Sequence, residues 1–278
     1  MFDGRLLVIA TKHEKETVIA PIVEKSLGVN CVVPENFDSD QFGTFSGEIE
    51  RKTSPLETAR MKCYSAMDVT GCDLAVASEG SFGPHPSILF IPADDELLIF
   101  IDKKKNIEIV VRELSTDTNF NSKEINSMEE LKSFAALVKF PSHALILKGK
   151  SQQHQKCMKG INDWDVLYEK YQELLCNGLN ISAETDMRAL YNPTRMSVIR
   201  KATLKLVDKI KSVCPYCQTP GFGVTDHREG LPCSLCGFKT KSTLSHISTC
   251  KNCTYTKEDL YPYGKTEEDP MYCDICNP

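Results

Sequence analysis

The chain has 278 residues and a formal net charge of −5 at pH 7; 41% of its residues are hydrophobic and 26% are charged. These values describe a globular protein with a buried core, and they argue against disorder or a coiled-coil rod. The acidic balance disfavours attraction to nucleic acid or anionic membranes. No apolar run approaches the roughly 20 residues that cross a bilayer, and Leu6–Ala10 is too short for a secretion signal. We therefore expect a soluble, cytoplasmic protein with no membrane partner.

The first 150 residues alternate strand-like and helix-like segments. Arg5–Ala10 is a short apolar run typical of a buried strand, and apolar residues recur at helical spacing over Glu14–Leu27. A second strand is expected at Val29–Val33. The Gly-, Asp- and Ser-rich stretch 36–52 predicts a long polar loop.

Ser54-Pro55-Leu56-Glu57 predicts the start of the next helix, with serine as N-cap, proline in the first turn and glutamate in the capping-box position. Asp73–Ala77 is another buried-strand candidate, and Ser78–Pro86 is expected to form a polar turn after it. Further strands are expected at Glu96–Asp102, Asn106–Leu114 and His143–Leu147, and further helices at Met128–Val138, Trp164–Leu175 and Arg195–Ile210.

The strand-helix-strand opening predicts an α/β fold class, namely a mixed-sheet α/β sandwich whose site lies at the strand ends. Strand signals stop near residue 150, and eight of the thirteen cysteines follow residue 213. We therefore expect an α/β phosphate-binding domain at 1–150, a helical connector at 151–212 and a cysteine-rich tail at 213–278.

The eight late cysteines all fall in C-x-x-C pairs, which let two thiolates face one ion from a tight turn. They are Cys214, Cys217, Cys233, Cys236, Cys250, Cys253, Cys273 and Cys276. The gaps of 15, 13 and 19 residues between pairs are close to the zinc pattern of two pairs 15–20 residues apart. A reducing cytosol argues against disulfides, and the spacing does not match ferredoxin clusters. We predict a zinc-ribbon-like tail with two structural zinc sites, each held by four cysteines.

The sequence constrains the choice of metal more strongly than it constrains which two C-x-x-C pairs share one ion. The gaps favour one zinc on the first two pairs and a second zinc on the last two. A cross-brace, in which the first pair joins the third, stays open. Lys211–Pro278 carries seven basic and eight acidic side chains, so the tail shows no basic groove for nucleic acid.

Four segments of the first domain carry more polar chemistry than packing needs. Thr11 and Lys15 lie where the first strand meets the first helix, a place where backbone amides and the helix dipole bind phosphate. Glu48 lies in the polar loop, Lys62 on the second helix, and Ser78-Glu79 after a buried strand. Each segment alone has an ordinary structural explanation. Together, at the ends of successive strands, they predict a site for a metal-chelated polyphosphate.

In that site Glu48 and Glu79 are expected to hold magnesium, with Thr11, Lys15, Lys62 and Ser78 on the phosphates. His13 or His85 is a candidate acid or base. Arg188 and Arg195 lie in a stretch with seven basic and two acidic residues, Thr185–Lys211, and could bind phosphate oxygens. A solvated helix face explains the same charges.

The order of these segments resembles the inosine/xanthosine triphosphatase superfamily of nucleotide pyrophosphatases. Thr11 and Lys15 match its opening T-G-N-x-x-K turn, although Lys12-His13 replaces Gly-Asn. Leu56–Lys62 resembles its helix motif, and Glu79 falls where that superfamily places a metal-binding or basic carboxylate. The resemblance covers about the first 110 residues and implies hydrolysis of a nucleoside triphosphate.

The whole chain also resembles a bacterial family described only as a domain of unknown function. The segments that carry this likeness are Ala10–His13, Gly43–Glu48, Ala77–Pro86, Thr185–Ala189, Asn192–Arg195 and the terminal cysteine pairs. This resemblance implies an organisation but no activity.

The sequence therefore predicts a magnesium-dependent hydrolase of a nucleoside triphosphate or related phosphoanhydride with a structural zinc tail. The alternative is a non-catalytic module whose zinc tail binds protein or nucleic acid. A thiol enzyme built on Cys157 is a third interpretation, for which nothing in the sequence fixes the geometry.

Overall fold

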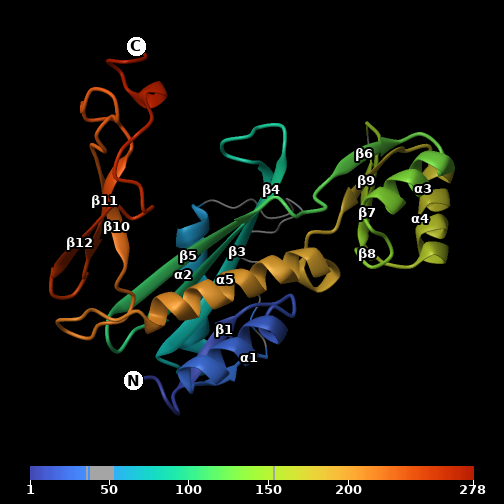
Figure 1. The fold of residues 1–278 in the computed structure, drawn as a ribbon. Coiled ribbons are helices and arrows are strands. Elements are labelled where there is room, and N and C mark those ends of the chain that lie inside the picture. Colours follow the sequence, from blue (N-terminus) through green and yellow to red (C-terminus); the bar gives the residue numbers. More distant parts are fainter. Residues whose placement is uncertain (36, 38–52, 153) are drawn as a thin grey trace. The chain divides into compact units, whose positions relative to one another are not determined.

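The computed structural model describes residues 1–35, 37, 53–152 and 154–278. They divide into two compact units, Met1–Val207 and Asp208–Pro278. The first unit holds two sheets and the second a smaller sheet carrying the cysteine pairs (Figure 1). The described part of the chain is thus a mixed α/β protein with five α-helices. None of these helices is long and apolar enough to cross a membrane.

The first sheet has the strand order β2-β1-β3-β4-β5. Its strands are β1 (Leu6–Ala10), β2 (Asn30–Val32), β3 (Leu74–Pro84), β4 (Pro92–Asp102) and β5 (Ile107–Ser115). The first three strands run parallel, and β4 and β5 add an antiparallel hairpin. The strands expected at Glu96–Asp102 and Asn106–Leu114 are both present, and β4 begins four residues earlier than expected.

Two helices connect the parallel strands. Helix α1 (Glu16–Leu27) keeps Pro21 inside it and ends at Gly28 with φ 70°. Helix α2 (Pro55–Thr70) begins as predicted, because the Ser54 side chain accepts a hydrogen bond from the amide of Glu57. It ends at Gly71, again with a left-handed φ, which glycine adopts without strain.

The two faces of the first sheet pack against different helices. Side chains of β3 and β4 alternate, so Ala75, Ala77 and Ile99 join the core beneath α2. Leu74, Val76, Leu98 and Phe100 point to the opposite face and are fully buried. The long helix α5 (Pro193–Lys211) lies across this sheet (Figure 1), and seven of its apolar or small residues are buried: Val198, Ile199, Ala202, Thr203, Leu206, Val207 and Ile210.

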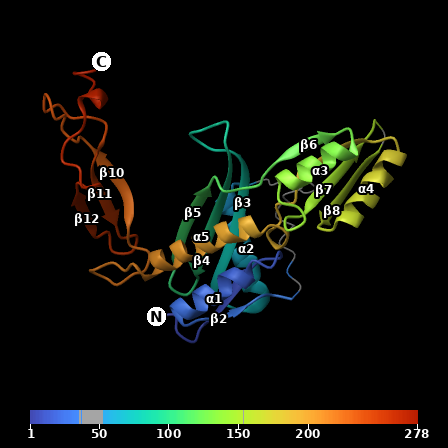
Figure 2. The ribbon, with the colours of Figure 1, turned by 45° about the vertical axis from the view of Figure 1, so that its right-hand side comes forward.

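The second sheet of the first unit is antiparallel, in the order β6-β9-β7-β8. Its strands are β6 (Ser122–Ile125), β7 (Leu145–Lys150), β8 (Gln155–Ile161) and β9 (Asn180–Thr185). Helices α3 (Met128–Leu137) and α4 (Trp164–Cys176) lie beside it (Figure 2). One apolar cluster contains side chains of both helices and of all four strands, so both helices cover the same face.

This second sheet corrects the prediction of a helical connector at 151–212, because β8 and β9 lie there. Strand β8 is an edge strand in which only Ile161 is buried, so it carries no apolar alternation to recognise. Strand β9 does alternate, but its buried positions include the small residues Ala183 and Thr185, which give a weak signal.

The second unit contains the three-stranded antiparallel sheet β10-β11-β12. The strands are β10 (Val224–Glu229), β11 (Thr243–Thr249) and β12 (Thr256–Leu260), and a short 3-10 turn, η3, covers Pro270–Tyr272. The cysteine pairs occupy the turns between and beside these strands. Most of the buried side chains of this unit are cysteines or small polar residues, so a packed apolar core is small here.

Candidate functional site

The candidate site lies where β1 stops and β3 continues. Ala10, the last residue of β1, pairs with Ala77. Strand β3 runs on to Pro84, and along Ser78–Pro84 its partner among the described strands is β4. Ser78 and Glu79 therefore lie within a strand, not in the polar turn that the sequence predicted. Their pairing with β4, the next strand along the chain, extends β3 beyond its apolar run.

Lys15 reaches this strand from the start of α1. Its Nζ donates to the Ser78 Oγ at 2.9 Å and lies 3.4 Å from the Ser78 carbonyl oxygen. The lysine is buried, with 8% of its surface exposed. Burial, together with the positive charge of Arg195, lowers the pKa of Lys15 to about 8. Lys15 is thus a buried amine whose pKa lies near neutral pH.

Lys62 and Glu79 meet on the opposite face of β3. The Lys62 Nζ on α2 lies 2.5 Å from the Glu79 Oε1, and both side chains are buried. Adjacent strand residues point to opposite faces, so Ser78 turns to Lys15 and Glu79 to Lys62. The two faces are still coupled electrostatically. The charge of Glu79 raises the pKa of Lys15, and the charge of Lys62 lowers it.

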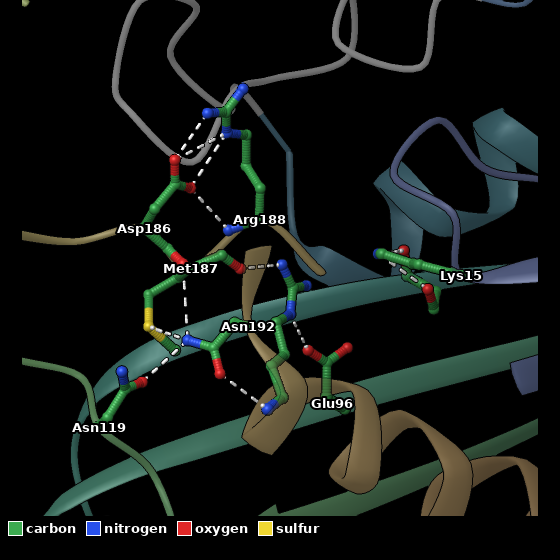
Figure 3. A network of polar contacts seen from close by, with 9 residues as sticks. Lys15, Glu96, Asn119, Asp186, Met187, Arg188 and Asn192 are labelled. Atoms are coloured by element: carbon green, nitrogen blue, oxygen red, sulfur yellow. Dashed lines mark hydrogen bonds and ion pairs between the residues drawn. The ribbon is translucent and has the colours of Figure 1, made fainter. Parts of the chain in front are cut away.

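Arg195 joins this group from the first turn of α5. Its Nε donates to the Glu96 Oε1 at 2.6 Å, and its Nη1 donates to the Met187 carbonyl at 2.5 Å. Its backbone amide donates to the Asn192 Oδ1 at 3.0 Å, so the buried Asn192 caps the helix (Figure 3). The guanidinium also stacks 5.0 Å from the centre of the Phe82 ring.

Gly80 makes room for this ion pair. A Cβ built on Gly80 would lie 2.5 Å from the Glu96 Oε1 and closer still to the Arg195 Nη2. No side chain fits at such distances unless the pair moves. Gly80 is therefore the position on β3 that admits the arginine of α5 to the sheet.

Two carboxylates of β4 belong to the site although the sequence analysis did not select them. Asp94 and Glu96 are fully buried, and they lie opposite Phe82 and Gly80 in the strand register. Burial and the negative charge of Glu96 raise the pKa of Asp94 to about 8. In the sequence these acids flank Asp95 at the start of the strand expected at Glu96–Asp102, where charged side chains are ordinarily solvated. The signal that could have found them is their period-two spacing ahead of the buried residues Leu98 and Phe100.

Six ionisable side chains thus form what we call the buried charge cluster: Lys15, Lys62, Arg195, Glu79, Asp94 and Glu96. At most 8% of the surface of any of them is exposed. Lys15 interacts electrostatically with each of the other five. Four of them (Lys15, Lys62, Arg195 and Glu79) had been predicted from the sequence as phosphate or metal ligands.

Of the other predicted residues, Ser78 accepts the hydrogen bond of Lys15 described above, and five are not members of the cluster: Thr11, His13, Glu48, His85 and Arg188. Arg188 donates through Nε and Nη2 to the buried Asp186 at 2.6–3.2 Å and stacks on Tyr191 (Figure 3). The Nδ1 of His85 accepts from the amides of Ser87 and Ile88, a local turn.

The other three predicted residues are Thr11, His13 and Glu48. The Thr11 Oγ1 is buried with no hydrogen-bond partner among the described residues. His13 is half-buried. Glu48 lies outside the described residues.

The cysteines of the second unit form two groups, Cys214/Cys217/Cys250/Cys253 and Cys233/Cys236/Cys273/Cys276. Within each group the thiol sulfurs all lie within 4.8 Å of one another, and the nearest pairs are 3.6–3.9 Å apart. A tetrahedron with Zn–S bonds of about 2.3 Å has edges of about 3.8 Å, whereas a disulfide needs about 2.05 Å. Both groups could therefore hold zinc.

The groups interleave, which corrects the predicted pairing of neighbours. The first C-x-x-C pair joins the third and the second joins the fourth, as in the cross-brace alternative. The antiparallel register of β10, β11 and β12 brings alternate turns to the same end of the sheet, and spacing alone does not encode this register.

Three of the turns share one backbone geometry. The residue after the second cysteine has a positive φ in each: Gln218 at 60°, Gly237 at 70° and Thr254 at 58°. Its amide donates to the carbonyl of the first cysteine at 2.9–3.0 Å. The turn thus aims both sulfurs of a pair at one point.

Comparison with known proteins adds one family. A family model described as "Domain of unknown function (DUF6671)" matches residues 62–278. No curated protein matches the chain. A similar solved structure is titled "Crystal structure of protein VC0702 from Vibrio cholerae", at 10% sequence identity and a TM-score of 0.31, covering 74% of this chain and 94% of that one. The matched family range contains five members of the buried charge cluster and all eight tail cysteines.

Proposed function

The chain belongs to the family described as Domain of unknown function (DUF6671), and for this member we propose metal-dependent hydrolysis of a phosphoanhydride. The proposed substrate class is a nucleoside triphosphate. The proposal rests on the buried charge cluster and is in line with the resemblance of the N-terminal segments to the inosine/xanthosine triphosphatase superfamily.

The observation that carries the proposal is the burial of three cations beside three carboxylates. Taking a charged side chain out of water costs several kcal/mol even when it is paired. Apolar packing would hold these strands together more cheaply, so a stability role alone does not account for the cluster. Buried charges with displaced pKa values, such as those of Lys15 and Asp94, are typical of functional sites.

The roles follow from where each group points. Lys15, just before α1, provides an ammonium group, and Ser78 on β3 provides the hydroxyl to which it donates. The dipole of α1 also favours an anion near Lys15. Arg195 offers a planar guanidinium suited to phosphate oxygens. Glu79 holds Lys62 in place. Fixed positive groups of this kind stabilise the charge that develops on phosphate oxygens during hydrolysis. A bound magnesium ion would neutralise phosphate charge and orient the attacking water.

Hydrolysis can be tested on the purified, zinc-loaded chain. Standard and deaminated nucleoside triphosphates would be incubated with Mg²⁺ while phosphate and pyrophosphate release are followed. We expect turnover of one nucleotide class, with loss of at least about 100-fold in Lys15→Met and Glu79→Gln, as for removal of a positioned charge in other active sites. The control is Glu57→Gln on the same helix as Lys62, because Glu57 is 53% exposed at its side chain.

A folded, zinc-loaded chain that releases neither product from any nucleotide would contradict the proposal. Turnover that persists unchanged in Lys15→Met would place the activity elsewhere in the chain. Circular dichroism of each variant separates loss of activity from loss of fold.

A second candidate function is a protein-binding module built on the zinc tail. The apolar side chains at three cysteine turns are exposed: Tyr216 is 77% exposed, Leu235 74% and Ile275 61%. The tail has no basic excess, so a protein partner fits better than nucleic acid. Fluorescence anisotropy with single-stranded oligonucleotides at two salt concentrations tests the choice. Binding that falls steeply with salt would favour nucleic acid instead.

A further inference from the structure

Asp94 and Glu96 stand side by side on one face of β4. Residues two apart on a strand lie about 6.7 Å apart and point the same way. Both side chains are fully buried, opposite Phe82 and Gly80 of β3. Their face is the one that receives Arg195, since the guanidinium of Arg195 contacts Gly80 and Glu96.

Within the described part of the chain, three of the four carboxylate oxygens of this pair accept no hydrogen bond. Arg195 donates to the Glu96 Oε1. Among the described residues, the Glu96 Oε2 and both oxygens of Asp94 have no hydrogen-bond partner. Buried polar atoms are nearly always paired, and an unpaired buried carboxylate is especially costly. The hydrogen bonds of the neighbouring cations go to other atoms: Lys15 donates to Ser78, and Arg195 donates to the Glu96 Oε1 and to the Met187 carbonyl.

We infer that Asp94 and Glu96 are ligands of a divalent metal ion of the magnesium or manganese class. Carboxylate oxygens are the ligands that these hard cations prefer. Magnesium is commonly held by one or two carboxylates together with substrate phosphates and water. Two carboxylates beside a phosphate-binding lysine and arginine meet that description.

The inference deepens the proposed function and rests on it for the role of the metal. It also places the metal at Asp94 and Glu96 instead of at Glu48 and Glu79, the ligands expected from the sequence. Glu79 is already paired with Lys62, on the other face of β3. The ion would instead lie on the face of Lys15 and Arg195, where it would bring a polyphosphate next to both.

The test measures metal binding without substrate. Zinc-loaded, full-length protein would be titrated with Mn²⁺, and free Mn²⁺ followed by electron paramagnetic resonance. The tail thiolates are soft ligands that retain zinc, so they do not compete for manganese. We expect one bound Mn²⁺ per chain, displaced by Mg²⁺. Asp94→Asn should weaken binding by more than about tenfold, since even outer-sphere partners of metal ligands cost about 10–100-fold.

Asp95→Asn is the matched control. It makes the same change one residue along the strand, where the side chain points to the other face and pairs with Arg112. We expect unchanged Mn²⁺ affinity in this variant. A wild-type chain that binds no Mn²⁺, or an Asp94→Asn chain that binds it as tightly, would overturn the inference. Loss of binding in Glu79→Gln but not in Asp94→Asn would do the same.

A second measurement on the wild-type chain covers the case in which Asp94→Asn does not fold. Fe²⁺ with ascorbate and peroxide cleaves the backbone close to its binding site. We expect cleavage near residues 92–98 and 78–84, suppressed by Mn²⁺. Cleavage confined to other segments would refute the site.

The two proposals fail separately. Mn²⁺ bound at Asp94 in a chain that hydrolyses no nucleotide would keep the metal site and refute the hydrolase. Hydrolysis in a chain whose Mn²⁺ binding ignores Asp94 would do the reverse.

Discussion

Arg195 and Glu96 form a buried ion pair, with 2.6 Å between the Arg195 Nε and the Glu96 Oε1, that joins the first turn of α5 to β4 across 99 residues of sequence. Both side chains are at least nine-tenths buried. The same arginine holds the Met187 carbonyl and stacks on Phe82. One side chain therefore fixes α5, the segment after β9 and β3 relative to one another.

Removing the arginine should be costly. Arg195→Met leaves the Glu96 carboxylate buried without its partner, and we expect unfolding to become easier by about 3–5 kcal/mol. Adding Glu96→Gln should recover part of this loss. Urea unfolding can be followed through Trp164, the single tryptophan, which packs on Phe140. A loss below about 1 kcal/mol, the scale of exposed pairs, would mean that water reaches the pair.

Gly80→Ala should disturb the same pair from the other side. The added Cβ would clash with both Arg195 and Glu96, and we expect a loss of about 1–3 kcal/mol, as for other overpacked sites. Gly83→Ala on the same strand is the control, because its Cβ would meet nothing within 4 Å. Thermal unfolding by circular dichroism compares the two. Equal melting temperatures of the two variants would show that Arg195 and Glu96 move aside for the added methyl group at no measurable cost in stability.

Binding of inorganic tripolyphosphate should weaken as the pH rises through about 8. Lys15 has its pKa lowered from 10.5 to about 8, so its ammonium is present below that pH and lost above it. Lys15→Met should bind weakly at every pH and lose this step. Lys25→Met, at the exposed end of α1, is the control and should keep it. Calorimetric titrations from pH 6.5 to 9.5 measure the effect. A step that survives in Lys15→Met would assign it to another group.

The same lowered pKa makes the free energy of unfolding rise between about pH 8 and 10.5. In that window the unfolded chain binds a proton at Lys15 that the folded chain does not. Lys15→Met should flatten this part of the stability curve.

Zinc content can test the interleaved groups. Cys217→Ser with Cys250→Ser removes two ligands of one group, and bound zinc should fall from two ions per chain to one. Cys217→Ser with Cys236→Ser takes one ligand from each group and should weaken both sites. Elemental analysis after mild chelation distinguishes these patterns. One retained ion in the second variant and none in the first would restore the pairing of neighbours.

The turn at Thr254 offers a stabilising change. A β-branched residue with φ 58° is strained by about 1–2 kcal/mol relative to glycine. Thr254→Gly should therefore slow zinc loss to a chelator. Gly237→Thr, at the equivalent position of the second pair, should hasten it by a similar factor. Unchanged rates in both variants would show that the turns open without passing through this conformation.

Local signals identified much of the architecture and several residues of the cluster. The first strand, the Ser54 cap and the repeated C-x-x-C pairs are encoded within a few residues, so the sequence reveals them. Lys15, Ser78 and Glu79 stood out because charged or polar residues follow apolar strands. The structure shows that these side chains lie close together. Hydrolysis by this site stays a prediction.

What the sequence concealed depends on contacts between distant residues. Asp94 and Glu96 belong to a run of three acids at the start of an expected strand, and their burial depends on the packing around the pairing of β4 with β3. All four cysteine pairs have the same local pattern, so the choice of partner depends on the register of the tail sheet. The second sheet was missed because its edge strand β8 has no apolar face of its own.

The composition of the buried charge cluster has a consequence for how a ligand would be captured. Three basic and three acidic groups balance to within one proton, so the cluster projects little field into the surrounding solvent. A ligand held there would be recognised at contact distance and not drawn from afar. A polyphosphate would arrive best with its own cation, as a nearly neutral unit. Its capture would then depend only weakly on ionic strength, unlike capture by a purely basic pocket.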